Sequence, residues 1–410
     1  MLKNYLKLAF KVLLRRKFFT FISIFAISLT LVVLMVVAAL LDQAFGPLPP
    51  ETRTDRTLGV YFARMSGPEN VNNGAPGFKF LDRYLRHLPQ AENFSICRHI
   101  ESIGVYHHGE PIKLWLKHTD GAFWEIFRFD FLEGGPFTAA DDRDGHPVAV
   151  INEATRSKFF DGQPALGRSL EVDGRRFRIV GVVANVSFLR LMPFADLWIP
   201  HGAAKIQVRG LVDSHLGIIL ARRAEEIPAL KTEFQARVQQ VEFDDPKRYN
   251  RFESAPETLF EFISRLLTNR QGESRPGRLL AAMVVAAVLF MLLPTINLIN
   301  INVSRILERS GEIGVRKAFG ASSWTLVGQF VVENILLTLI GGAIGFVLSR
   351  LVLLAITESG LIPYADFQLN YRIFGYGLLI SVFFGLFSGV YPAWKMSRLH
   401  PVEALKGVVR

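Results

Sequence analysis

The chain has 410 residues, of which 50% are hydrophobic and only 20% are charged, so it is more apolar than an ordinary soluble domain. Its net charge is +10, yet residues 42–277 hold 30 Lys/Arg against 31 Asp/Glu. The basic excess flanks apolar segments, at 1–17, 304–323 and 394–410. This distribution argues against a nucleic-acid partner and favours a membrane protein.

Residues 1–17 carry six basic residues and no acidic one, and their apolar residues fall on one arc of a helix. This pattern predicts an amphipathic helix on the inner membrane surface, in contact with lipids. Residues 18–41 follow without a charge, and as a helix they exceed the roughly 30 Å hydrocarbon core. A cleaved signal peptide has an apolar core of about 7–15 residues and a small-residue cleavage site, which this run lacks. We therefore expect a membrane anchor.

Residues 42–277 show mixed α/β signals and are long enough for two subdomains. Asn152 follows a short apolar run and is a plausible N-cap for a helix over 153–160. The dipeptide Asp173-Gly174 separates two alternating runs, which is a strong β-hairpin signal. Apolar residues over 227–241 recur at helical spacing.

The remaining apolar runs complete the predicted topology. By the positive-inside rule, the three basic segments are cytoplasmic and residues 42–277 lie outside. The fold class is therefore a membrane protein with four transmembrane α-helices and a large mixed α/β extracytoplasmic domain inserted between helices 1 and 2. The expected spans are 18–41, 278–303, 324–356 and 373–393, with a short external loop at 357–372 and a cytoplasmic tail at 394–410.

Catalytic and metal-binding signatures are weak in this sequence. The chain contains no Gly-Lys dipeptide, which excludes a phosphate-binding P-loop, and no H-E-x-x-H motif. His107-His108 could be a metal site, but neighbouring strand residues point to opposite faces. The acidic residues Asp141, Asp142 and Asp144 are typical of a solvated turn. Cys97 is the only cysteine, which we expect to be a buried apolar residue.

Polar residues also occur inside the predicted spans. Gln329 and Glu333 lie one turn apart in the third span, and Asn297 lies near the end of the second. A carboxylate within a membrane is costly and marks a functional hypothesis. Pairing with a neighbouring helix and ion translocation are both compatible with Glu333, and we favour pairing.

Residues 304–323 predict a short charged helix between two spans. Ser310 can cap it, Glu312 and Arg316 form an i,i+4 pair, and Gly320 can supply a left-handed stop. Such a helix, held at both ends by membrane helices, could transmit displacement. A tight connector that contacts lipid headgroups is the alternative interpretation.

The stretch "GEIGVRKAFGAS" resembles the coupling segment of the MacB/FtsX-like ABC transporter permeases. The closing pattern "YPAWKMSRLHPVEAL" and the external stretch "FWEIFRFDFLEGGPF" are similar to the same family. Gly311 departs from the family pattern, which usually has a basic residue just before the Glu. The resemblance implies four spans, a dimer of permease subunits, either homodimer or heterodimer, and two cytoplasmic ATPase subunits.

The resemblance implies a permease of the bacterial inner membrane with both termini cytoplasmic. It would be no enzyme and bind no cofactor itself, because the partner ATPase would hold ATP and Mg. A periplasmic adaptor protein can belong to such assemblies. The function implied is mechanotransmission, in which ATP hydrolysis moves the external domain and expels or extracts substrate; the alternative is an FtsX-like signal relay that activates an external enzyme. The implied coupling residues are Glu312, Ile313, Gly314, Arg316, Lys317, Ala318, Phe319 and Gly320.

Overall fold

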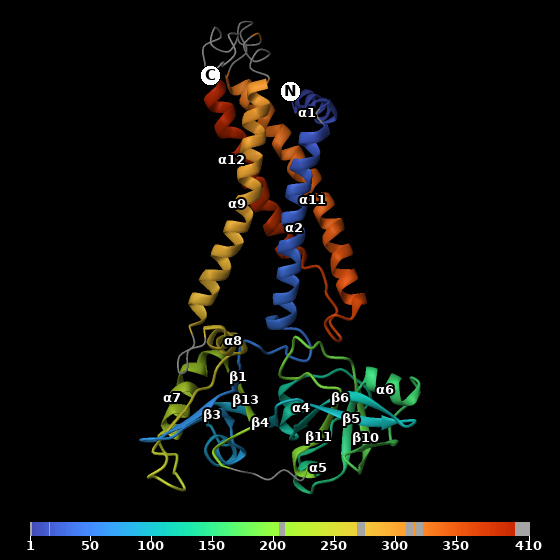
Figure 1. The fold of residues 1–410 in the computed structure, drawn as a ribbon, viewed down its shortest axis with the longest axis vertical. Coiled ribbons are helices and arrows are strands. Elements are labelled where there is room, and N and C mark those ends of the chain that lie inside the picture. The colour runs from blue at the N-terminus through green and yellow to red at the C-terminus, as the bar shows by residue number, and fades with distance from the viewer. Residues whose placement is uncertain are drawn as a thin grey trace. The chain divides into compact units, whose positions relative to one another are not determined.

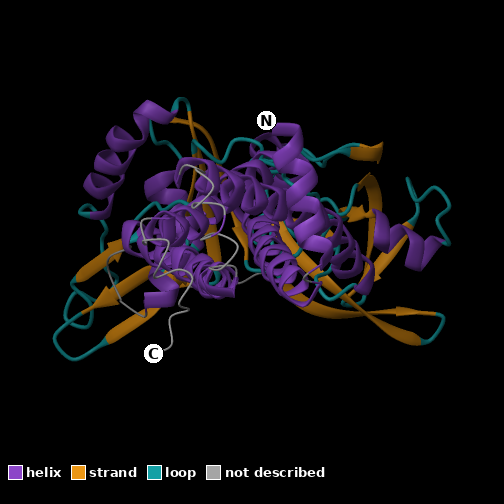
Figure 2. Ribbon diagram, turned by 90° about the horizontal axis from the view of Figure 1, so that it is seen from above, coloured by secondary structure: helices purple, strands orange, loops and turns teal. Residues whose placement is uncertain are grey.

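The structure, a computed structural model, describes residues 2–15, 17–204, 210–268, 275–308, 315 and 323–397. The chain divides into two compact units. All described strands, orange in Figure 2, belong to one unit, which we call the α/β unit. The described residues of the other unit, which we call the helical unit, form helices and loops. The α/β unit comprises Asp42–Gly277 and Ile362–Asp366, and the helical unit comprises Met1–Leu41, Arg278–Leu361 and Phe367–Arg410.

Two helical stretches of the described chain, Lys17–Phe45 and Val327–Ser359, are long and apolar enough to cross a membrane. Two shorter apolar stretches, Pro276–Phe290 and Tyr371–Leu386, lie in the remaining long helices. The count of four spans therefore stays a prediction. The helices of this part, labelled in Figure 1, are α1 (Leu2–Arg15), α2 (Lys17–Phe45), α9 (Pro276–Glu308), α11 (Ser323–Ser359) and α12 (Tyr371–Ser397).

Small residues bring α2 and α11 into close contact. A Cβ added at Gly345 would lie 3.2 Å from Leu31 Cβ and 3.3 Å from Ser28 Cα. One turn earlier, the Ser28 hydroxyl donates to the Gly341 carbonyl at 2.8 Å. Two glycines four residues apart thus form a flat surface, the arrangement that lets membrane helices approach closely.

The α/β unit is built on a ten-stranded mixed sheet. Its order is β1-β13-β4-β6-β11-β8-β10-β7, with β5 paired to β6 and β9 to β10. Most neighbours are antiparallel, but β10 runs parallel to β8 and β11 parallel to β6. The strands are β1 (Thr57–Val60), β4 (Ala91–Arg98), β5 (Glu101–His107), β6 (Glu110–Thr119), β7 (Phe131–Gly134), β8 (Val148–Asn152), β9 (Ser169–Val172), β10 (Arg175–Val183), β11 (Leu197–Pro200) and β13 (His215–Ala221).

A second, four-stranded sheet has the order β12-β3-β2-β14. Its strands are β2 (Ala63–Ser66), β3 (Val71–Pro76), β12 (Val212–Asp213) and β14 (Arg251–Ser254). The helices of the α/β unit are α3 (Phe78–Phe80), α4 (Ala122–Ile126), α5 (Ala139–Arg143), α6 (Glu153–Phe160), α7 (Ile227–Val238) and α8 (Leu259–Thr268).

Three apolar clusters stabilise this unit. The first joins strands of both sheets to α7 and includes Phe80, Phe234 and Phe252. The second is rich in aromatic rings around the fully buried Trp198, and the third packs the β9–β10 hairpin against β6, β8 and β11. Burial of apolar surface on this scale is the main favourable contribution to folding.

Most local predictions for this unit are confirmed. Asn152 caps α6 by accepting a hydrogen bond from the Thr155 amide at 2.8 Å. Asp173 and Gly174 connect β9 and β10 with φ values of +49° and +73°, as a two-residue hairpin turn requires. Cys97 is fully buried in β4, and burial raises its pKa to about 11. The solvated turn expected at the acidic residues is only partly correct: Asp141 and Asp142 lie in the short helix α5, where Asp141 forms a capping box with Thr138 and Asp142 accepts a hydrogen bond from the Gly202 amide, and only Asp144 follows the helix.

Two buried histidines meet where the sheets join. The rings of His201 and His215 lie 5.0 Å apart, and Phe78 stacks on His201 at 4.9 Å. Burial lowers the pKa of His201 to about 3 and that of His215 to about 4. Both rings are therefore neutral in the folded protein at physiological pH.

Replacing Gly174 by Ala tests the hairpin. Gly174 has φ +73°, and a Cβ added there meets nothing within 4 Å. The loss of stability in Gly174→Ala therefore comes from backbone strain alone. We expect a loss of about 1–2 kcal/mol in the free energy of unfolding, measured by urea denaturation of the purified chain. Gly135→Ala, where an added Cβ also meets nothing and φ is not positive, is the control. Equal losses for both variants would contradict the turn assignment.

The histidine pair predicts an acid-sensitive fold. In the unfolded chain each imidazole binds a proton below its ordinary pKa of 6.5, whereas the folded chain keeps both neutral. Above pH 6.5 the two histidines therefore have no pH-dependent effect, and as the pH falls from 6.5 toward 4, proton binding to the unfolded chain lowers the free energy of unfolding by up to roughly 1.4 kcal/mol per histidine and pH unit. In His215→Phe, thermal unfolding should depend less on pH between 6.5 and 4 than in the parent. Parallel pH profiles would refute this.

Candidate functional site

Three segments of the α/β unit lead to or from the helical unit, and each is fixed within the α/β unit by polar contacts. We call these residues the three junctions. The first follows α2, the second is the start of α8, the last described element before α9, and the third is the segment 362–366 between α11 and α12.

Arg190 holds the first junction. Its guanidinium donates to the Gly46 carbonyl at 2.9 Å and to the Glu51 carboxylate at 3.1 Å. The side chain of Arg190 is 1% exposed and that of Glu51 is 10% exposed. Burial raises the pKa of Glu51, while the nearby guanidinium opposes that rise. A charge pair withdrawn from water in this way is costly unless its partners stay in place, so it disfavours separation of the first junction from the rest of the unit.

Tyr364 holds the third junction. Its hydroxyl donates to the Asp196 carboxylate at 2.7 Å, and the Phe188 amide donates to the Pro363 carbonyl at 3.0 Å. Burial and the bond to Asp196 raise the pKa of Tyr364, which keeps the hydroxyl a donor. Asp196 also accepts from Asn152 and from the Trp115 amide, each at 2.9 Å. The third junction is thereby tied to β6 and β8.

The first and third junctions share one segment of the α/β unit. Phe188, Arg190 and Asp196 all lie in the connection between β10 and β11, which we call the junction loop (residues 187–196). Its Ser187 and Arg190 side chains are buried. A displacement of this loop is therefore communicated to both junctions.

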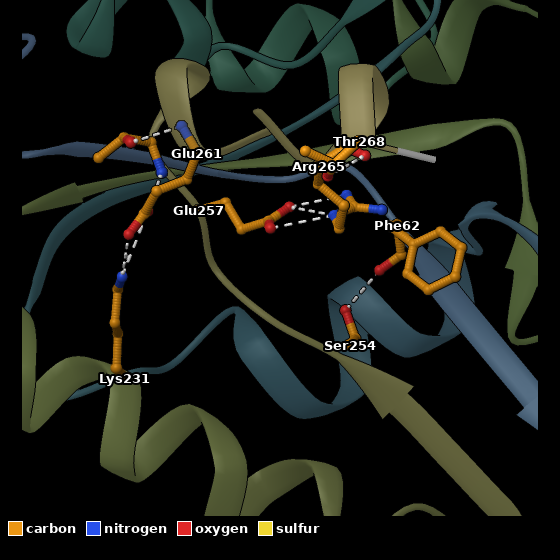
Figure 3. Close-up of polar contacts among 8 residues, drawn as sticks. Phe62, Lys231, Ser254, Glu257, Glu261, Arg265 and Thr268 are labelled. Carbon is orange, nitrogen blue, oxygen red and sulfur yellow. Dashed lines mark hydrogen bonds and ion pairs between the residues drawn. The ribbon is translucent and has the colours of Figure 1, made fainter. Parts of the chain in front are cut away.

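The second junction is the start of α8, shown in Figure 3. Arg265 binds both oxygens of Glu257, with a closest distance of 2.7 Å, and its guanidinium lies 4.7 Å from the Phe62 ring centroid. The two side chains are 11% and 8% exposed. Backbone hydrogen bonds between Glu257 and Gly59 attach this point to β1. A bidentate, stacked arginine is a geometrically specific contact.

Helix α8 begins with a capping box. Thr258 and Glu261 exchange hydrogen bonds between side chain and backbone at 2.7 and 3.1 Å. Glu261 also pairs with Lys231 of α7 at 3.1 Å, as Figure 3 shows. On the opposite side, the Phe260 ring meets Phe45 at 5.5 Å, which brings the first and second junctions together.

The coupling residues predicted from the sequence, Glu312–Gly314 and Arg316–Gly320, lie outside the described residues. Gln329 and Glu333 are buried on α11, with exposed fractions of 5% and 3%. Asn297 lies in a different helix, α9. His107 ends β5, and His108 turns the chain with φ +50°. The structure therefore locates Gln329 and Glu333, which the sequence predicts to lie in the membrane, in the interior of the helical unit.

Sequence reasoning missed the junction residues. Arg190 and Tyr364 are single polar residues between apolar neighbours, and no spacing identifies their partners 139 and 168 residues away. The capping-box pattern Thr258-x-x-Glu261 before an apolar run was a usable signal for the start of α8.

Two family models match this chain. The MacB-like periplasmic core domain matches residues 20–237, and the FtsX-like permease C-terminal domain matches residues 284–401. A pyoverdine export ATP-binding/permease protein, PvdT of Pseudomonas fluorescens, is 28% identical over 85% of this chain and 51% of its own length. The chain thus spans about half the length of that relative.

An uncharacterized ABC transporter permease, YknZ of Bacillus subtilis, is 23% identical over 82% of this chain and 81% of its own length. The crystal structure of the periplasmic region of MacB from Actinobacillus actinomycetemcomitans covers 53% of this chain and 94% of that chain. Its TM-score is 0.36 and its sequence identity 14%.

The buried pair at the second junction predicts a large stability effect. Arg265→Met leaves the Glu257 carboxylate buried without its partner, which should lower the free energy of unfolding by about 3 kcal/mol. The control is Arg251→Met, because Arg251 pairs with Glu253 at 2.7 Å but is 72% exposed. That variant should lose less than about 1 kcal/mol in the same urea titration. If the two variants lose the same stability, the second junction is not held by this pair.

Proposed function

The chain belongs to the family of FtsX-like permeases with a MacB-like periplasmic core domain, and from this premise we propose that it couples ATP hydrolysis by a separate ATPase to movement of its periplasmic α/β unit. Movement of that unit would expel or extract a substrate outside the membrane. The chain itself would be the permease subunit and would hydrolyse no ATP.

The input of force is assigned to the charged segment between α9 and α11. We assign contact with the ATPase to residues 312–320, with Glu312, Arg316 and Gly320 as the electrostatic and shape-defining positions. The ATPase would hold ATP and Mg, because the chain contains no P-loop. Its contact would displace this segment when ATP binds.

The three junctions are the observation that carries the proposal. Each one fixes a chain connection to the folded core of the α/β unit by buried contacts: Arg190 with Gly46 and Glu51, Arg265 with Glu257, and Tyr364 with Asp196. A connection that served only as a linker would need no such contacts, since linkers are exposed and make few. Helix displacements would therefore reach the sheet instead of being absorbed at flexible joints.

The proposed assembly lies in the bacterial inner membrane with both chain termini in the cytoplasm. It contains a second permease subunit and two ATPase subunits, surrounded by lipids, and it can contain a periplasmic adaptor. The close packing of α2 on α11 through Gly341 and Gly345 suits a rigid transmitting pair within each subunit.

Tyr364→Phe tests transmission. The change removes one hydroxyl and its hydrogen bond to Asp196 but keeps the ring. The complex is purified from native membranes with its ATPase, and a pair of fluorophores reports movement of the α/β unit on addition of ATP. We expect normal assembly and hydrolysis, with a movement signal at least about threefold smaller than in the parent.

The matched control is Tyr371→Phe, because Tyr371 is 74% exposed at the start of α12 and should leave the signal unchanged. Two results would overturn the proposal: purification of the chain without any ATP-binding subunit, or measurable hydrolysis by the chain alone. An unchanged signal in Tyr364→Phe would remove the third junction from the transmission path.

A further inference from the structure

A surface groove of the α/β unit lies between strand β14 and helix α7. It has a volume of about 650 Å³, within the range of ligand-binding pockets. One side consists of residues 250–255, which contain β14, and the other includes Gln235 and Val238 of α7 and Gln239, which caps its C-terminal end. Glu257 and Arg265 of the second junction are among its lining residues, whereas no contact residue of the first or third junction lines it.

Strand β14 is an edge strand. It pairs with β2 on one side and, among the described residues, with no strand on the other. An edge strand carries backbone N–H and C=O groups that a further strand can pair with. The Gln235 side chain already donates to the Ser254 carbonyl at 3.0 Å, so a side chain of the groove supplies one bond of this kind.

The floor of the groove is apolar and its rim carries amides. Val238, Val241 and Phe252 are 4%, 8% and 6% exposed, and they belong to the first core cluster. Gln239 and Asn250 lie at the rim. The four residues of β14 at about 3.3 Å each give an edge of about 13 Å, enough to pair with about four residues of an added strand.

The charges of the groove are balanced. Arg251 pairs with Glu253 and Arg265 with Glu257, each at 2.7 Å. These are the only charged side chains among the lining residues, all of which are described, so the groove carries no net charge. The groove therefore suits an uncharged segment from the interior of a longer chain.

We propose that the groove between β14 and α7 binds an extended, uncharged internal segment of a partner protein, which adds a strand to the edge of β14. Backbone hydrogen bonds to β14 hold the segment, and alternate apolar side chains enter the floor at Val238, Val241 and Phe252. This interaction goes beyond the proposed transport function and needs no ATPase.

The test uses the full-length chain in detergent and a fluorescein-labelled, acetylated and amidated octapeptide of alternating Thr and Val. We expect saturable binding by fluorescence anisotropy. Two further peptides carry N-methyl groups on the backbone amides of all Thr or of all Val residues. In an added strand only alternate amides face β14, so one of these two peptides should bind at least about tenfold more weakly than the unmethylated octapeptide.

Two variants give the matched comparison on the protein. Gln239→Trp fills the rim and should weaken binding at least about tenfold, whereas Gln240→Trp, at an exposed neighbour that does not line the groove, should leave binding unchanged. Circular dichroism and thermal unfolding establish that both variants are folded. Neither residue is in a junction, so failure here leaves the proposed function standing.

Three results would overturn the proposal. They are no binding of the octapeptide to the parent chain, equal binding by the two Trp variants, and a requirement for free peptide termini. The last result would show that the groove takes a free peptide and not an internal segment. Binding of both N-methylated peptides with unchanged affinity would likewise exclude strand addition.

Discussion

The buried pairing of Arg190 with Glu51 is the contact on which the architecture of the α/β unit most depends. Arg190 is almost fully buried, and a guanidinium in that position is tolerated only while a carboxylate and a carbonyl accept its hydrogen bonds. Those acceptors come from the residues that directly follow α2. The requirement to satisfy one buried charge therefore determines where the chain leaves the helix.

The two units are stabilised by different interactions. In the helical unit, α2 and α11 pack closely because Gly341 and Gly345 have no side chains. Close packing of this kind stabilises helix pairs in lipid, where the hydrophobic effect does not favour association. The α/β unit combines apolar clusters with charged contacts placed at its chain connections. Specific, directional contacts thus occur where the chain changes from one environment to the other.

Local signals in the sequence predicted local structure well. Asn152 and the Asp173-Gly174 turn act on residues next to them, so their consequences can be inferred without knowing the fold. Arg190 and Tyr364 could not be predicted in the same way, because each depends on a partner more than a hundred residues away in the chain. Residues 362–366 show the same limit: the sequence predicts a short external loop, and the bond from Tyr364 to Asp196 incorporates it into the α/β unit. The prediction that residues 312–320 couple the chain to an ATPase rests on their resemblance to the family.

The junction loop has a mechanical consequence for timing. Because Arg190 and Phe188 are two residues apart, the end of α2 and the segment after α11 are anchored to the same short piece of chain. Their displacements relative to the sheet must be in phase, whereas the start of α8 is anchored separately through β1 and α7. Because the Phe45 and Phe260 rings also connect the start of α8 to the first junction, the three anchored points act on the α/β unit as one linked set.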